Sequence, residues 1–213
     1  YTPSTACIIQ RELGAIGSMA IDVNCACAGF VYGLDMARRY LATEETMKYA
    51  LVVAAENLTK VVDYSDRSTC ILFGDGAAAC VVERSENSLY ASFLGADGNG
   101  AKHLSARSFP PANAFMPENP KAYPDGLVEG NGHYLFQDGK EVYKFATKML
   151  PNALNAAAQK AGLTKDDIDL IIPHQANIRI IETAVQNIGL PMERFYVNLH
   201  KYGNTSSASI PLA

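Results

Sequence analysis

Three residues of the chain have the types and surroundings of catalytic groups, and the first is Cys27. The apolar run at 19–24 precedes it, and apolar residues then recur at helical spacing to about residue 41. We therefore expect Cys27 at a strand-to-helix corner, at or next to the first turn of a helix. Free N–H groups and the helix dipole favour an anion there, so we expect a stabilised thiolate. A buried cysteine that only packs is the alternative, but the small residues around Cys27 leave space over the sulfur and favour a nucleophile.

The second candidate, His174, has a similar setting. It lies in the run 173–177, after a buried apolar segment and before a helical pattern. In open α/β sheets, ligands bind outside the carboxyl ends of the strands, so two such corners can face one cavity. The other histidines, His103, His133 and His200, lie in glycine-rich or polar stretches, where solvated surface histidines are expected.

The third candidate, Asn204, follows Gly203 and precedes a run of small hydroxyl residues. Taken alone, it is better explained as the N-cap of a helix than as a catalytic group. Cysteine, histidine and asparagine in this chain order also occur in papain-like proteases. The sequence around Cys27 lacks the signature of those proteases, the chain has no tryptophan, and strands alternate with helices. We therefore exclude a protease.

Composition narrows the function classes further. With 48% hydrophobic and 19% charged residues among 213, the chain is ordinary for a globular protein. A net charge of −4 gives no basic field for nucleic acid, and no apolar run is long enough to span a membrane. The five cysteines show no zinc-ligand spacing, so we expect no metal and a reduced, cytoplasmic setting. Because the chain begins at Tyr1 and stops where a helix is expected, we interpret it as an internal fragment.

The elements that must position these residues are those of an α/β protein. In the first half we expect helices at 4–13 and 27–41 and strands at 19–24, 49–55, 77–82 and 88–94. Strand, helix, strand in that order favours a parallel βαβ pairing. In the second half we expect a helix at 140–161 that Pro151 kinks or splits, a strand at 168–172 and a helix at 177–187. Glycine and proline dominate the excursion between the halves.

At these motifs the chain resembles β-ketoacyl-acyl-carrier-protein synthase III, a member of the thiolase superfamily. The residues that carry the resemblance are Asp22-Val23 with Ala26-Cys27-Ala28-Gly29-Phe30, Phe73-Gly74-Asp75-Gly76-Ala77, Pro173-His174-Gln175-Ala176-Asn177 and Gly203-Asn204-Thr205-Ser206. The resemblance implies a duplicated thiolase-like fold, with two mixed sheets and helices in α-β-α-β-α layers, and a homodimer. Residues 1–90 would belong to the half that carries the nucleophile. Residues 91–213 would hold the excursion and the half with the histidine and asparagine.

The resemblance also implies a mechanism. Cys27 would accept an acyl group from coenzyme A, and malonyl-acyl-carrier protein would then lose carbon dioxide and attack the acyl-cysteine. His174 and Asn204 would hold the enolate oxygen. This reaction, which initiates fatty acid synthesis, would need no permanently bound cofactor.

Further residues match binding positions of the family. Arg67, Asn177 and Phe73 match positions near coenzyme A and the acyl pocket. Arg179, Lys144 and Lys148 match the basic patch for the acidic carrier protein. The alternatives are that Phe73 is an ordinary core residue and that the three cations only form a solvated helix face. Lys140 departs from the family, which often has an asparagine there, and this bears on how coenzyme A is held.

Two alternatives remain open from the sequence. One is another thiolase-superfamily enzyme, similar to 3-hydroxy-3-methylglutaryl-CoA synthase or associated with polyketide synthesis. The other is a non-catalytic homologue that binds carrier protein. The acyl-chain preference is not readable from these motifs.

Overall fold

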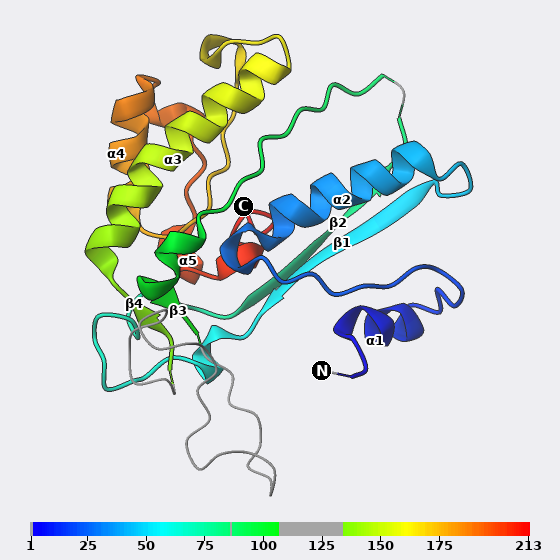
Figure 1. The fold of residues 1–213 in the computed structure, drawn as a ribbon, viewed down its shortest axis with the longest axis horizontal. Helices are drawn as coiled ribbons and strands as arrows, with labels where there is room; N and C mark the ends of the chain where they lie inside the picture. The colour runs from blue at the N-terminus through cyan, green and yellow to red at the C-terminus, as the bar shows by residue number, and fades with distance from the viewer. Residues whose placement is uncertain (1, 86, 107–133) are drawn as a thin grey trace, which may run out of the picture.

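A computed structural model describes residues 2–85, 87–106 and 134–213 of the chain (Figure 1). The helices are α1 (Thr5–Glu12), α2 (Gly29–Thr43), α3 (Gly139–Lys160), α4 (Ile178–Ile188) and α5 (Leu199–Tyr202). The strands are β1 (Tyr49–Glu56), β2 (Gly76–Glu83), β3 (Leu104–Ser105) and β4 (Phe136–Gln137). No helix among the described residues is both long and apolar enough to cross a lipid bilayer.

Strands β1 and β2 form an antiparallel ladder, and α2 packs on one of its faces (Figure 1). The ladder runs from Tyr49 opposite Glu83 to Glu56 opposite Gly76. Side chains alternate along a strand, so Val52 and Ala54 are buried towards Phe30 of α2. The opposite face carries exposed apolar side chains: Tyr49, Leu51, Val53 and Val81. The predicted strands at 49–55 and 77–82 are therefore confirmed.

The predicted parallel βαβ unit is wrong for the described residues. Residues 19–24 are not in a ladder, and β1 pairs with β2 in antiparallel fashion. The predicted strand at 88–94 is also extended chain without a ladder partner. It is held across α2 by side chains, since Ser92 donates a hydrogen bond to Asp35 (2.6 Å) and Tyr32 donates one to the carbonyl of Gly95 (3.2 Å). An apolar run indicates burial, but it does not indicate which segment pairs with it.

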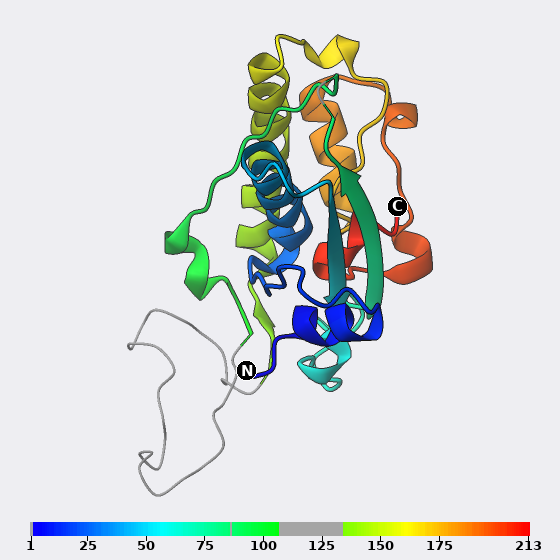
Figure 2. The same cartoon turned by 90° about the vertical axis from the view of Figure 1, so that its right-hand side faces the viewer.

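Helices α3 and α4 lie side by side and point in the same direction (Figure 2). The hydroxyls of Tyr143 and Thr183 are 2.6 Å apart, and one turn further on Asn187 donates to the carbonyl of Thr147 (3.3 Å). One face of α4 packs into the core cluster of this half, which consists of Ile171, Ile181, Val185, Ile188, Leu190 and Phe195. Both helices match the predicted ranges, although α3 is not split at the buried Pro151.

The predicted strand at 168–172 is reduced to a single parallel bridge between Ile171 and Phe195. Asp138 caps α3, because its carboxylate accepts hydrogen bonds from the backbone N–H groups of Lys140 and Glu141. Asn177 caps α4 in the same manner. Most of the predicted excursion, including His133, lies outside the described residues.

Two distant motifs meet where Asn204 lies beside the turn at 72–76. The backbone N–H of Asn204 donates to the carbonyl of Leu72 (2.8 Å), and the N–H of Gly74 donates to the carbonyl of Asn204 (2.9 Å). These bonds form a short parallel bridge between Phe73 and Asn204. The contact is close, since a Cβ atom at Gly74 would lie 2.4 Å from the carbonyl oxygen of Tyr202.

Replacement of Gly74 by alanine should therefore destabilise the protein. The added methyl group meets backbone, which cannot move away as a flexible side chain can, so we expect a loss of about 1–3 kcal/mol in the free energy of unfolding. The matched control is Gly139→Ala in the first turn of α3, where a Cβ atom has nothing within 4 Å. That variant should be neutral or more stable by about 0.4–1 kcal/mol. Urea denaturation measures both, and equal stability of the two variants would contradict the tight contact.

Candidate active site

Cys27 lies in a single 3₁₀ turn, Ala26–Ala28, that leads directly into α2. The prediction of a cysteine next to the first turn of a helix is confirmed. The turn is unusual, because Ala26 has a φ of 45°, a left-handed conformation that alanine rarely adopts. Gly29 lets the start of α2 lie close to Ser207. A Cβ atom added at Gly29 would lie 3.3 Å from the Cβ atom of Ser207.

The expectation of a stabilised thiolate is not supported. Burial raises the pKa of the Cys27 thiol above its ordinary value, and the negative charge of Glu56 raises it further. The Ser206 side chain lowers the pKa, but by less than burial raises it. The sequence reveals the helix start, but it does not reveal that Cys27 is partly buried and lies near a carboxylate.

His174 follows the apolar run 168–172, and its side chain is partly buried. Its Nδ1 atom lies 2.6 Å from the hydroxyl oxygen of Ser209. Burial lowers the pKa of His174 to about 4, so the imidazole is neutral near pH 7. A neutral imidazole carries one N–H donor and one acceptor nitrogen.

Asn204 is 5% exposed. Its side-chain oxygen accepts a hydrogen bond from the backbone N–H of Ser206 (2.9 Å), which has a φ of 50°. This bond closes an Asx turn and is not the expected helix cap, because the residue that caps the short 3₁₀ segment Ser206–Ser209 is Thr205. The Asx turn uses the oxygen of the Asn204 side chain and leaves the Nδ2 amide as the donor that can face a ligand.

The three predicted residues converge on residues 204–209, which we call the serine turn. Asn204 begins it, the Ser206 side chain lies near the thiol of Cys27 and influences its pKa, and Ser209 contacts His174. Figures 1 and 2 show this turn beside the start of α2. Thus one short segment links side chains from three distant parts of the chain.

Sequence reasoning missed the partners within this turn. Ser206, Ser207 and Ser209 are each at most 6% exposed. Ser207 donates from its backbone N–H (3.2 Å) and from its hydroxyl to the carboxylate of Glu56, at the end of β1. The signal in the sequence is the run of small residues at 205–209, four of which carry a hydroxyl group, although this pattern by itself indicates a helix start.

The remaining predicted residues lie at several places around this centre. Phe73 is half-buried and bridges Asn204 through its backbone, whereas Arg67 is exposed. Asn177 uses its side-chain oxygen to accept the N–H of Arg179 (2.9 Å) at the start of α4. Its Nδ2 amide is the group that it could offer to a ligand.

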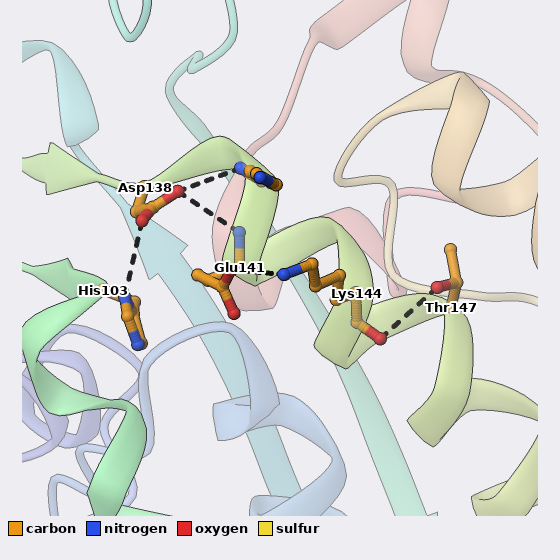
Figure 3. A network of polar contacts seen from close by, with 6 residues as sticks. His103, Asp138, Glu141, Lys144 and Thr147 are labelled. Atoms are coloured by element: carbon orange, nitrogen blue, oxygen red, sulfur yellow. Dashed lines mark hydrogen bonds and ion pairs between the residues drawn. The ribbon is translucent and has the colours of Figure 1, made fainter.

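The predicted basic residues lie on two packed helices. Lys144 and Lys148 are exposed on α3, and Arg179 is exposed in the first turn of α4. Figure 3 shows that Lys144 binds Glu141 (2.6 Å), next to Asp138, which also contacts His103 (3.5 Å). The part of the chain that the structure describes contains no group of three metal-ligating side chains.

Comparison with solved structures identifies the class of the fold. The chain matches the crystal structure of β-ketoacyl-[acyl carrier protein] synthase III from Thermus thermophilus with a TM-score of 0.86 and 42% identity, over 99% of this chain and 62% of that one. The priming β-ketosynthase of the R1128 polyketide pathway matches with a TM-score of 0.82 and 36% identity, over 100% and 61%. The fold is therefore thiolase-like, although only two two-stranded sheets are present among the described residues.

Comparison of sequences identifies the family. Models of the two parts of 3-oxoacyl-[acyl-carrier-protein] synthase III match residues 21–98 and 158–213, and the chain belongs to this family. The synthase III of Caldanaerobacter subterraneus is 45% identical over 99% of this chain. The chain spans 62% of the length of that relative.

The reactivity of Cys27 should report its raised pKa. Only a thiolate is alkylated quickly, so iodoacetamide should modify Cys27 slowly at neutral pH, because burial raises the pKa of its thiol above that of an ordinary cysteine. Peptide mass spectrometry follows each cysteine, and the exposed Cys7 serves as the internal control. An alkylation midpoint near or below neutral pH would restore the stabilised thiolate expected from the helix start.

Proposed function

We propose that this protein joins an acyl group from coenzyme A to malonyl-acyl-carrier protein by a decarboxylating Claisen condensation, the step that initiates fatty acid synthesis. The observation that carries the proposal is the convergence of Cys27, His174 and Asn204 on the serine turn, in a chain of the synthase III family. Coenzyme A thioesters and the carrier protein are then substrates, and no permanently bound cofactor takes part. The proposal places the reaction in the cytoplasm of the cell.

The first step is acyl transfer to Cys27. The sulfur attacks the thioester carbonyl, the bond to the sulfur of coenzyme A breaks, and the proton of the thiol ends on the departing coenzyme A. Because the pKa of Cys27 is raised and His174 is neutral, the resting site holds a thiol rather than an ion pair. The backbone N–H of Cys27 would stabilise the oxyanion that forms during the attack.

The second step is loss of carbon dioxide from the malonyl group. The electron pair of the breaking bond moves into the thioester as an enolate, which then attacks the acyl group on Cys27 and releases the sulfur as a thiolate. The thiolate takes up a proton from solvent, which restores the thiol of the resting site. His174 and the Nδ2 amide of Asn204 would donate hydrogen bonds to the enolate oxygen. Such a donor is worth about 3–4 kcal/mol in a transition state. A neutral His174 suits this role, since it stays a donor without placing a positive charge in a buried site.

Other predicted residues belong to the proposed binding surfaces. Arg67, Asn177 and Phe73 would contact coenzyme A or line the acyl pocket. The exposed cations Arg179, Lys144 and Lys148 would face the acidic carrier protein. We propose a homodimer, as the family resemblance implies.

A second candidate is priming of polyketide synthesis by the same chemistry. The match to a priming ketosynthase at 36% identity favours it as the alternative. The two functions differ in the carrier protein and in the primer, so a panel of purified carrier proteins distinguishes them.

Replacement of His174 or Asn204 by alanine should separate the two steps. We expect both variants to take label from acetyl-coenzyme A onto Cys27, but to release carbon dioxide from malonyl-carrier protein about 10²–10³-fold more slowly, because an oxyanion donor is missing. Radiolabel on the protein and released labelled carbon dioxide are the two measurements. Cys27→Ala is the control and should take no acyl label. Normal carbon dioxide release by either variant would refute the role assigned to that residue. If the wild-type protein took no acyl label from acetyl-coenzyme A, the proposal that it is an acyl-transferring enzyme would be refuted.

Charge reversal at Arg179 should weaken the use of the carrier protein. Opposite charges at the rim of an interface mainly speed association, so Arg179→Glu should raise the KM for malonyl-carrier protein about tenfold. The KM for malonyl-coenzyme A should stay unchanged. Lys48→Glu, at an exposed cation beside β1, is the matched control. An equal effect of both reversals would argue against a docking surface at the start of α4.

A further inference from the structure

The hydroxyl of Ser209 makes the direct side-chain contact to the ring of His174. Ser209 ends the 3₁₀ part of the serine turn and is 2% exposed. In the part of the chain that the structure describes, its oxygen has two partners: Nδ1 of His174 at 2.6 Å and the backbone N–H of Gln175 at 3.2 Å. Neither contact was expected from the sequence.

These two contacts differ in what they require of the hydroxyl. The N–H of Gln175 can only donate, so it occupies a lone pair of the serine oxygen. The hydroxyl proton then remains to be placed, and in the described chain Nδ1 is the acceptor that lies within reach. A proton donated to Nδ1 requires that Nδ1 carries none of its own.

The backbone beneath His174 is fixed by other bonds. The side chain of Gln175 is fully buried and donates to the carbonyls of Pro173 (2.8 Å) and Tyr196 (3.1 Å). Its oxygen accepts the N–H of Asn198 (3.0 Å). The orientation of the imidazole is therefore set from one side by a rigid backbone and from the other by Ser209.

We propose that Ser209 is a positioning residue that donates its hydroxyl proton to Nδ1 of His174 and thereby holds the imidazole in the tautomer with its proton on Nε2. The inference rests on the proposed function for the use of that proton. With Nε2 protonated, His174 is a hydrogen-bond donor to a substrate oxygen and has no free nitrogen with which to accept the proton of Cys27. Ser209 would thus decide which of the two chemical steps the histidine serves.

The tautomer can be measured without any assay of activity. In protein labelled with ¹⁵N-histidine, the two ring nitrogens of His174 have separate resonances, assigned by their loss in His174→Ala. We expect a protonated Nε2 and an unprotonated, hydrogen-bonded Nδ1 at neutral pH. A proton on Nδ1 in the wild-type protein would overturn the proposal.

Two serine variants then test the cause. Ser209→Ala should move the Nδ1 resonance towards that of an acceptor without a partner, whereas Ser207→Ala should leave both His174 resonances in place. Ser207 is the matched control because it is a buried serine of the same turn that binds Glu56 instead. Unchanged His174 resonances in Ser209→Ala would also overturn the proposal.

The kinetic arm links the tautomer to the reaction. Ser209→Ala should slow carbon dioxide release from malonyl-carrier protein by about tenfold, which is the scale of one lost hydrogen bond, and should leave acyl transfer to Cys27 within about twofold. An equal loss in both steps would indicate a merely structural serine and would overturn the positioning role. If the wild-type protein released no carbon dioxide, the proposed function would fail, while the nitrogen resonances would still decide the role of Ser209.

Discussion

The two backbone hydrogen bonds between Asn204 and the turn at 72–76 are the constraint on which the rest of the site depends. They attach the C-terminal serine turn to the end of the β1–β2 unit. Ser207 adds a second attachment by binding the carboxylate of Glu56. Once the turn is held there, Ser206 lies beside Cys27 and Ser209 beside His174, so one short segment aligns groups from both halves. The motif Phe73-Gly74-Asp75-Gly76 therefore serves the site through its shape, since Gly74 allows the backbones to approach where a Cβ atom would not fit.

The backbone on either side of Cys27 is strained, as expected where surrounding contacts hold a turn in place. Ala26 and Ser206 are the non-glycine residues with positive φ in the described chain, and they stand beside and opposite the sulfur. Left-handed backbone costs about 1–2 kcal/mol for such residues, so surrounding contacts must hold it in place. Those contacts are the packing of Gly29 against Ser207 and the hydrogen bond from Ser206 to the side chain of Asn204. The same contacts that position Cys27 therefore also balance the cost of the backbone geometry around it.

The sequence predicted the positions of the candidate site residues better than it predicted the sheets. Cys27, His174 and Asn204 could be found because each lies at a boundary between elements, where helical spacing and turn residues leave a clear pattern. The helices α1, α2, α3 and α4 followed from the same spacing. The parallel βαβ unit could not be predicted, because the run at 19–24 shows only that its residues are apolar. The partners Glu56, Ser207 and Ser209 were hidden for another reason: their contacts join residues far apart in the chain, and a serine has no sequence feature that tells a cap from a positioning group.

The pKa values of the two central groups explain why this site suits condensation better than proteolysis. A cysteine protease needs a base beside its sulfur, and the pair works as thiolate and imidazolium. Here burial moves the two groups in opposite directions, since the pKa of Cys27 is raised and that of His174 falls to about 4. An ion pair is therefore disfavoured from both sides, and Glu56 opposes negative charge on the sulfur further. Acyl exchange between two thiols tolerates this, because the attacking and leaving groups are alike and the proton passes between them without a net change. In the proposed reaction, the decarboxylation step would gain from an uncharged donor, which can bind a developing enolate without first forming a buried cation.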